Sequence, residues 1–332
     1  MLLTAELVPD LALGCAVLGS GGGGSTSLSA ALAAQAIEEC GPVQVCAPGL
    51  LPADTAVFTV SQAGSTLLSE EMLGGRADAE VMREALERLT GRVPRAVLCA
   101  EIGGFGGPFA VAWAARLGLP LFDADAIGRA YPRMDQNVFE LAGLPAGPAL
   151  LCDGRGRTVL LDWADGAWLE RFVRASLDAY GGQVFSCDYP VDAGQVAEYA
   201  VGDSVSRALR IGAAVRAGDP DAAGLRTLAT AKVTEVGQYE GHTEAVLSGV
   251  LADADRLLRL VVADEYLAVF ENGEPLAMVP DVITLLGSSG PVSAEELRYG
   301  QRVTVVTARS APAWYTPAGL ALGGPEAFGV RT

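Results

Sequence analysis

Residues 43 to about 165 alternate between short β-like runs and helical runs, and this alternation limits the possible folds more than any other feature. The runs VQVCA, AVFTVSQ, RAVLCAEIG and PLFDAD have the apolar character of strands. Between them, RADAEVMREALERLTG and GPFAVAWAARLG have helical spacing, and the first closes on Gly91. Strands and helices joined by short connections predict a sheet covered by helices. The run ALLCDGRGRTVLLDW then predicts a hairpin that turns at Asp153 and Gly154.

The second half of the chain changes from helical to strand-like. Amphipathic helices are predicted over residues 166–180 and about 203–217, and strand-like runs fill 229–310, with turns at Asn272-Gly273 and around Gly290-Pro291. This pattern favours a small antiparallel β domain or barrel. We therefore predict an α/β N-terminal domain, a sheet covered by helices, over residues 1–165. A β-rich C-terminal domain with flanking helices is predicted over 166–332.

Composition narrows the class of protein and its partners. The net charge is −17 and the sequence pI is near 4.4, which disfavours binding to nucleic acid or to an anionic membrane surface. No basic residue precedes Arg76 and no apolar run approaches the roughly 18 residues of a membrane span, so neither a signal peptide nor a membrane helix is expected. Six scattered cysteines without a C-x-x-C motif are typical of a reducing cytosol. We expect a cytoplasmic protein, and a homo-oligomer is left open.

The run VLGSGGGGSTS, residues 17–27, matches G-x-G-x-x-G at glycines 19, 21 and 24. A dinucleotide site needs a strand before this motif and an acid after the next strand. Pro9 and the spacing of the preceding leucines predict a helix there instead, and VQVCAPG ends without an acid. Two interpretations stay open. The backbone N–H groups of Gly21, Gly22, Gly23, Gly24 and Ser25 cradle an anion or a carbonyl, or the glycines are a flexible joint between helices.

Acidic residues end two neighbouring strands and are the candidate catalytic groups. Asp123 and Asp125 stand two apart in PLFDAD, so a strand turns both side chains to one face, where one could serve as general base and the other as acid. Glu101 ends the neighbouring strand, before Gly103 and Gly104. Arg129 follows one turn beyond Asp125 and could clamp a carboxylate. Helix capping, a solvated edge and a plain ion pair are the structural alternatives for these residues.

Metal binding is possible but not required by these residues. Three acids suit magnesium, calcium or manganese, whereas zinc is poorly supported because His242 is the single histidine. We expect no cofactor, with a divalent metal as the open alternative.

Several motifs resemble the S-methyl thiohydantoin desulfurase family. These are AVLGSGGGGS near the start, EIGG at 101–104, GLPLFDADAIGRAYP, and the late runs AMVPDVITLL, LRYGQRVTVV and PAWYTPAGLALGGPEAFG. The resemblance implies a two-domain fold and a hydrolase that acts on small cyclic amidine or imide rings. The family's named activity adds water to an S-methylated thiohydantoin, releases methanethiol and leaves a hydantoin.

Three positions depart from the family pattern. Ser25 stands where the family has aspartate, Gly106 where it has asparagine, and Arg133 where it has an acid. These departures motivate an alternative function, a non-catalytic ligand-binding or partner subunit of a hydantoin-processing system. A nucleotide-binding protein is the third and least favoured alternative. For the hydrolase we predict Asp123, Asp125 and Glu101 as catalytic groups. The predicted binding groups are Gly21 to Ser25, Gly103, Gly104 and Arg129.

Overall fold

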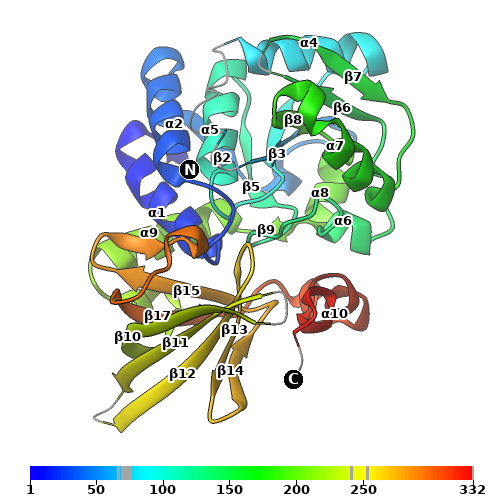
Figure 1. Cartoon of the computed structure of the whole chain (residues 1–332). Coiled ribbons are helices and arrows are strands. Elements are labelled where there is room, and N and C mark those ends of the chain that lie inside the picture. The colour runs from blue at the N-terminus through cyan, green and yellow to red at the C-terminus, as the bar shows by residue number, and fades with distance from the viewer. Residues whose placement is uncertain (66–67, 69–76, 154, 240–241, 252–253, 331–332) are drawn as a thin grey trace.

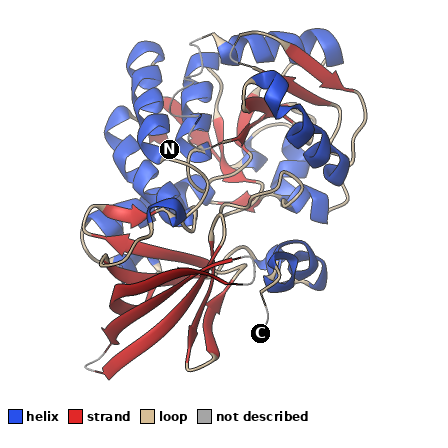
Figure 2. Ribbon diagram, in the orientation of Figure 1, coloured by secondary structure: helices blue, strands red, loops and turns tan. Residues whose placement is uncertain are grey.

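Parallel strands separated by helices build the first of two sheets, as the alternation predicted (Figure 1, Figure 2). The computed structural model describes residues 1–65, 68, 77–153, 155–239, 242–251 and 254–330. Among these residues the strand order is β1-β2-β5-β4-β3-β8-β6-β7, and the short β9 pairs with β5. Strands β2, β5, β4 and β3 run parallel, while the strands outside them pair antiparallel. The strands are β1 (Leu2–Leu3), β2 (Val43–Cys46), β3 (Val57–Gly64), β4 (Ala96–Cys99), β5 (Leu121–Asp125), β6 (Ala149–Cys152), β7 (Thr158–Leu161), β8 (Gln183–Cys187) and β9 (Val201–Gly202).

Helices cover both faces of this sheet because alternate strand residues are apolar on both sides. Phe58 and Val97 pack with one group of helices, and their neighbours Val57 and Leu98 pack with another. The first group is α1 (Val8–Leu18), α2 (Thr26–Cys40), α4 (Asp78–Thr90), α5 (Gly106–Leu117) and α9 (Ser204–Arg216). The second is α6 (Val138–Leu141), α7 (Gly166–Tyr180) and α8 (Ala193–Tyr199).

The second sheet is antiparallel throughout, in the order β14-β13-β12-β11-β10-β17-β15-β16 among the described strands. Its ends are β14 and β16, so its pairing is that of an open sheet and not of the barrel that was the alternative. Asn272 and Gly273 form the tight turn between β13 and β14 with φ angles of 52° and 86°. The elements are β10 (Arg226–Tyr239), β11 (His242–Leu251), β12 (Ala254–Val262), β13 (Tyr266–Glu271), β14 (Glu274–Met278), β15 (Val282–Gly287), β16 (Gly290–Val292), β17 (Arg302–Ala308) and α10 (Pro317–Gly323).

This architecture confirms the predicted fold class, an α/β part followed by a β-rich part with helices. The boundary predicted between residues 165 and 166 stays a prediction, since the first sheet continues past it: β8 pairs with β3 and β6, and β9 pairs with β5. The predicted hairpin of β6 and β7 is present, although Gly154 at its turn lies outside the described residues.

Hydrogen bonds donated by the second half of the chain join it to the first half. Thr284 Oγ1 donates to the carbonyl of Val17 at 2.6 Å, and the Tyr266 N–H donates to the carbonyl of Ser20 at 2.7 Å. Trp314 Nε1 donates to the carbonyl of Ile127 at 2.7 Å. These contacts place the loop after α1 and the loop after β5 against the second sheet. In the part of the chain that the structure describes, no helix combines the length and apolar character needed to cross a membrane.

Candidate active site

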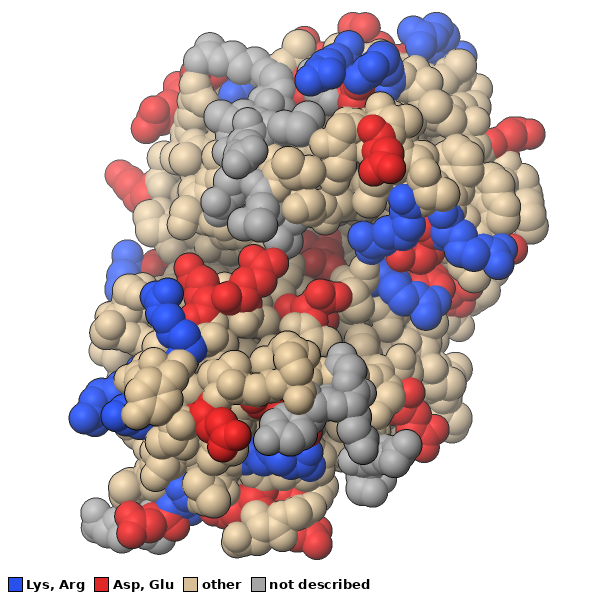
Figure 3. All heavy atoms as spheres, in the orientation of Figure 1, with Lys and Arg blue, Asp and Glu red and all other residues tan. Residues whose placement is uncertain are grey.

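A cavity of about 1220 Å³ lies between the two sheets. Its walls come from the glycine loop, the ends of β3 and β4, the loop after β5, the turn between β12 and β13, and residues 291–296. Carboxyl ends of parallel strands are where open α/β sheets bind ligands. Figure 3 shows that acidic side chains gather around and inside the hollow between the two halves of the molecule.

The glycine loop joins two helices and is held rigidly at the edge of the cavity. Gly21, Gly23 and Gly24 have φ angles of 88°, 76° and 79°, which side chains rarely adopt. The Ala294 N–H donates to the carbonyl of Gly21, and the Phe105 N–H donates to that of Gly23, both at 2.7 Å. Because helix α1 precedes the loop, the motif lacks the strand that a dinucleotide site requires.

Close packing leaves no room for a side chain at Gly21, Gly22 or Gly23. A Cβ atom on Gly23 would lie 2.8 Å from the carbonyl oxygen of Gly103, and one on Gly104 would lie 2.2 Å from that of Gly23. Gly103 and Gly104 therefore pack against the loop from the side away from the cavity. They do not line the cavity, whereas residues 21–25 do.

Glu101 lines the cavity directly after β4. Its Oε2 atom accepts a hydrogen bond of 3.2 Å from the Tyr131 N–H. Burial raises the pKa of the Glu101 carboxyl well above its usual range; the Tyr131 N–H lowers it, and the nearby Glu265 raises it further. Glu101 therefore favours its protonated form.

Glu265 is a candidate site residue that the sequence analysis did not identify. It lies in the short turn between β12 and β13, is 3 % exposed, and lines the same cavity from the second sheet. A Cβ atom on Gly22 would lie 2.8 Å from its Cγ, so the glycine loop and Glu265 are in direct contact. Burial raises the pKa of Glu265 to about 8, although the positive charge of Arg129 lowers it in part. Acidic turn residues between strands usually face solvent, so the run VVADEYLAVF carries no signal of this burial.

Asp123 and Asp125 are turned away from the cavity toward helix α9. The Asp123 carboxylate accepts hydrogen bonds from the backbone N–H and the hydroxyl of Ser206 in the first turn of α9. Asp125 Oδ2 accepts hydrogen bonds from the N–H groups of Ile102, Ile127 and Gly128 at 2.9, 3.2 and 2.7 Å. Burial raises the pKa of Asp125 to about 6, and these donors oppose that rise. The geometry gives both aspartates a structural role: they hold α9 and the loops after β4 and β5.

Arg129 is fully buried and connects the two sheets. Its Nη1 donates to the carbonyls of Pro280 and Asp281 at 3.2 and 2.7 Å, and its Nε donates to that of Ala130 at 3.0 Å. Its guanidinium carbon lies 4.8 Å from the centre of the Tyr131 ring. Arg129 is not among the residues that line the cavity, and its positive charge lowers the pKa values of Glu101 and Glu265. Its predicted role as a clamp on a ligand stays a prediction.

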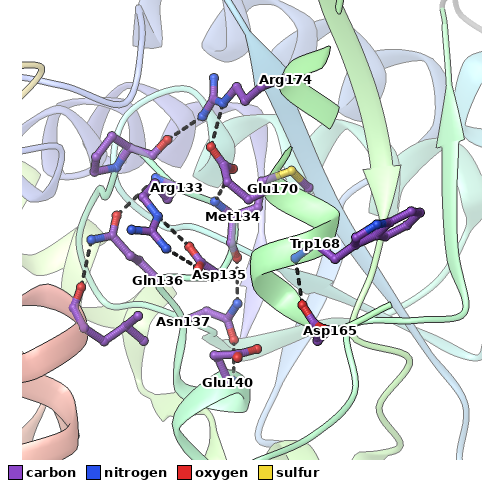
Figure 4. Close-up of polar contacts among 12 residues, drawn as sticks. Arg133, Met134, Asp135, Gln136, Asn137, Glu140, Asp165, Trp168, Glu170 and Arg174 are labelled. Carbon is purple, nitrogen blue, oxygen red and sulfur yellow. Dashed lines mark hydrogen bonds and ion pairs between the residues drawn. The ribbon is translucent and has the colours of Figure 1, made fainter. Parts of the chain in front are cut away.

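The loop after β5 is held in place by α7 (Figure 4). Glu170 Oε2 accepts a hydrogen bond from the Met134 N–H at 3.0 Å, and Arg174 donates to the carbonyl of Pro132. Arg174 also pairs with Glu170 at 2.8 Å. Asn137 caps α6 by accepting from the N–H groups of Phe139 and Glu140. This network fixes the wall of the cavity that residues 131–134 form.

Among the described residues, no group of three or more His, Cys, Asp or Glu side chains is arranged to hold a metal ion. The three acids considered for a metal point to different partners: Glu101 to the cavity, Asp123 to Ser206, and Asp125 to the backbone beside it. The described side chains of these three acids therefore do not converge on one point, and the divalent metal stays an open alternative.

Comparison with known families identifies the relationship. The model of the S-Me-THD-like N-terminal domain matches residues 6–163, and that of the S-Me-THD-like C-terminal domain matches residues 164–332. The chain belongs to the S-Me-THD-like family. This confirms the resemblance to the S-methyl thiohydantoin desulfurase family that the sequence motifs indicated.

A solved structure shares the fold of this S-Me-THD-like chain. It is a protein from Chromobacterium violaceum, with 22 % sequence identity and a TM-score of 0.82 over 99 % of this chain and 96 % of that one. A search of curated proteins found no match.

The positions that depart from the S-Me-THD-like pattern lie around the cavity. Ser25 precedes α2 without a capping hydrogen bond from its side chain, Gly106 begins α5, and Arg133 pairs with Asp135. All three line the cavity. A Cβ atom on Gly106 would lie 2.2 Å from the carbonyl oxygen of Glu101, so this backbone excludes any side chain there. An asparagine at position 106 would therefore require the backbone after Glu101 to take a different course.

Proposed function

We propose that this S-Me-THD-like chain is a hydrolase that acts on a small cyclic amidine or imide ring, such as an S-methyl thiohydantoin, in the cavity between its sheets. One observation carries the proposal: Glu101 and Glu265 reach one cavity from different sheets, and burial raises the pKa of both carboxyls. Two neighbouring carboxyls lose their protons one after the other, so between the two steps one is ionised while the other stays protonated. Because the pKa of Glu265 is raised to about 8, its carboxyl ionises as the pH rises through about 8. That pair supplies a general base and a general acid.

The proposed reaction uses the pair in two roles. The ionised carboxylate accepts a proton from water as the water oxygen attacks the ring carbon that bears sulfur. The protonated carboxyl gives its proton to the adjacent ring nitrogen, which takes up the electron pair of the C=N bond. The C–S bond then breaks, a new C=O bond forms, and the thiolate leaves with the hydroxyl proton as methanethiol. The ring becomes a hydantoin.

The glycine loop supports the proposed reaction through its backbone. Gly21, Gly23 and Gly24 have positive φ angles, and the contact of Gly22 with Glu265 brings backbone atoms of the loop close to that carboxyl. Backbone N–H groups at such a loop can hold a ring carbonyl as negative charge develops on its oxygen. A rigid loop serves this purpose because its donors need no rearrangement during the reaction.

Methanethiol release from S-methyl thiohydantoins tests the function, with a thiol-reactive dye as the readout. We expect Glu101→Gln and Glu265→Gln each to lower kcat by about 100-fold or more, since general acid–base groups contribute roughly that much. Glu274→Gln is the matched control, because Glu274 is exposed on β14 and outside the cavity. Unchanged turnover in both cavity variants would remove the pair from the mechanism.

The departures at Ser25, Gly106 and Arg133 favour a second candidate, a binding protein without turnover. Both candidates predict that a hydantoin raises the melting temperature of the protein. They differ in product: a binding protein stabilised by S-methyl thiohydantoin would release no methanethiol from it.

A further inference from the structure

The cavity continues beyond the carboxyl pair to a second group of polar residues, which we call the Asp188 arm. It is lined by Thr59 and Ser61 of β3, Asn137, and the residues Asp188 and Tyr189 that follow β8. The whole cavity, at about 1220 Å³, exceeds the roughly 300–1,000 Å³ of ordinary small-molecule sites. A single five-membered ring held between Glu101 and Glu265 therefore leaves room for a substituent.

Asp188 is a buried carboxylate without a cation beside it. It is 5 % exposed, and its Oδ2 accepts a hydrogen bond of 2.8 Å from the Ser186 hydroxyl. In the described parts of the chain no arginine or lysine forms an ion pair with it. Burial raises its pKa to about 6, so the group is ionised at neutral pH. Buried charges are normally paired, and a lone one costs stability.

Thr59 gives the arm a second polar group. Its residue is 1 % exposed, and its hydroxyl has no hydrogen-bond partner among the described residues. Thr59 and Ser61 are two apart on β3, and Ser61 is the register partner of Ser186 on β8. Side chains two apart share a face, so Thr59 lies on the same side of the sheet as Ser186 and Asp188. Two other polar side chains of the arm are occupied: Tyr189 donates to Glu140, and Asn137 caps α6.

The charged residues of the cavity favour a cationic substituent over an anionic one. Its basic residues, Arg133 and Arg174, are each paired with a carboxylate. Its acids include Asp188, Asp264 and Glu296, besides Glu101 and Glu265, whose raised pKa values favour the uncharged form. An anionic substituent would meet repulsion here, whereas a cation gains attraction.

We infer that the Asp188 arm is a specificity subsite that binds a protonated amino group carried on the side chain of the ring substrate. The ammonium donates to the Asp188 carboxylate and to the Thr59 hydroxyl, so the ligand supplies the cation that the fold omits. The ring then lies toward Glu101 and Glu265. This inference rests on the proposed function, because it identifies the class of ring that the same cavity takes.

Binding calorimetry with four probes tests the inference. The probes are hydantoin, 5-(4-aminobutyl)hydantoin, 5-pentylhydantoin, which replaces the ammonium by a methyl group, and 1-aminopentane, which has no ring. For the unmodified protein we expect the aminobutyl ring to bind at least about tenfold more tightly than the pentyl ring, in line with a charge-assisted hydrogen bond. Asp188→Asn should remove this preference and leave hydantoin binding unchanged. Thr59→Val should reduce it in part.

Asp162→Asn is the matched control, since it removes the same charge from an exposed residue outside the cavity. Equal binding of the aminobutyl and pentyl rings would overturn the subsite and leave the ring site standing. Binding of 1-aminopentane that Asp188→Asn abolishes, with no binding of any ring, would support the subsite and overturn the proposed function. If no probe binds, both are overturned.

Discussion

Replacing Glu265 by glutamine should have two effects: it removes the proposed activity and makes the protein more stable. Glu265 has its pKa raised from 4.5 to about 8 in the folded chain, mainly by burial. At pH 7 the folded protein therefore holds this group protonated, while the unfolded chain ionises it. At about 1.4 kcal/mol for each pH unit, this difference lowers the free energy of unfolding by about 3 kcal/mol at pH 7. Glutamine has the same shape and no proton to hold.

The change of this stability difference with pH tests the reasoning more sharply than its value at pH 7 alone. A raised folded-state pKa means that the folded protein binds the extra proton between pH 4.5 and 8, so stability falls as pH rises through that range. The glutamine variant lacks this fall. Its advantage in free energy of unfolding should grow by about 2 kcal/mol between pH 5.5 and 7 and level off above pH 8. Urea unfolding at pH 5.5, 7 and 8.5 measures it, away from the sequence pI near 4.4.

Glu274→Gln serves as the control here too, because Glu274 is exposed on β14 and outside the cavity. A Glu265→Gln difference that is the same at pH 5.5 and 8.5 would refute the reasoning. So would a variant less stable than the unmodified protein at pH 8.5.

Three further changes test the structural roles assigned above. Asp125→Ala leaves three buried N–H groups without an acceptor, so urea unfolding should show a loss of about 3 kcal/mol or more, and an unchanged midpoint would contradict that role. Gly23→Ala should lower the melting temperature and abolish ring binding in a thermal-shift assay, because the added Cβ meets the Gly103 carbonyl and the residue has a positive φ. Gly49→Ala is the control and should change neither, since open space surrounds Gly49. Trp314→Phe leaves the Ile127 carbonyl without its donor and should lower the free energy of unfolding by about 1–3 kcal/mol; a smaller loss would mean that water replaces the indole.

Local patterns predicted the elements well, because short-range physics decides them. The helix before the glycine loop followed from Pro9, and Gly91 ends α4 in the left-handed conformation that glycine favours. Asn272 and Gly273 make the tight turn that their types indicate. In each case the deciding residues lie within one or two turns of the chain.

Long-range pairing set the limits of sequence reasoning. β8 enters the first sheet beside β3, more than a hundred residues earlier, and no periodicity of either strand specifies that partner. The aspartates show the same limit for side chains. Their spacing in β5 predicted a shared face, but the docking of α9 decides that this face is covered.

Glu265 shows how burial escapes local reasoning. The turn between β12 and β13 has the composition of a solvated hairpin end, and only the contact with the glycine loop buries it. Glu101 was identified because it follows a buried strand, a signal contained in its own neighbourhood. In a site formed by two sheets, the sequence thus predicted the carboxyl of the first sheet and not that of the second.

The hydrogen bonds that cross between the sheets determine how a molecule reaches the cavity. Arg129 donates to carbonyls of the second sheet's loops, Tyr266 donates to Ser20, and Trp314 donates to Ile127. A swinging of the two halves would break these bonds together, and at buried Arg129 and Trp314 water could not replace them. We therefore expect a ligand to enter through the hollow seen in Figure 3, without separation of the halves. Rapid-mixing experiments should accordingly record association in a single phase, with no slow opening step that caps the rate at high ligand concentration.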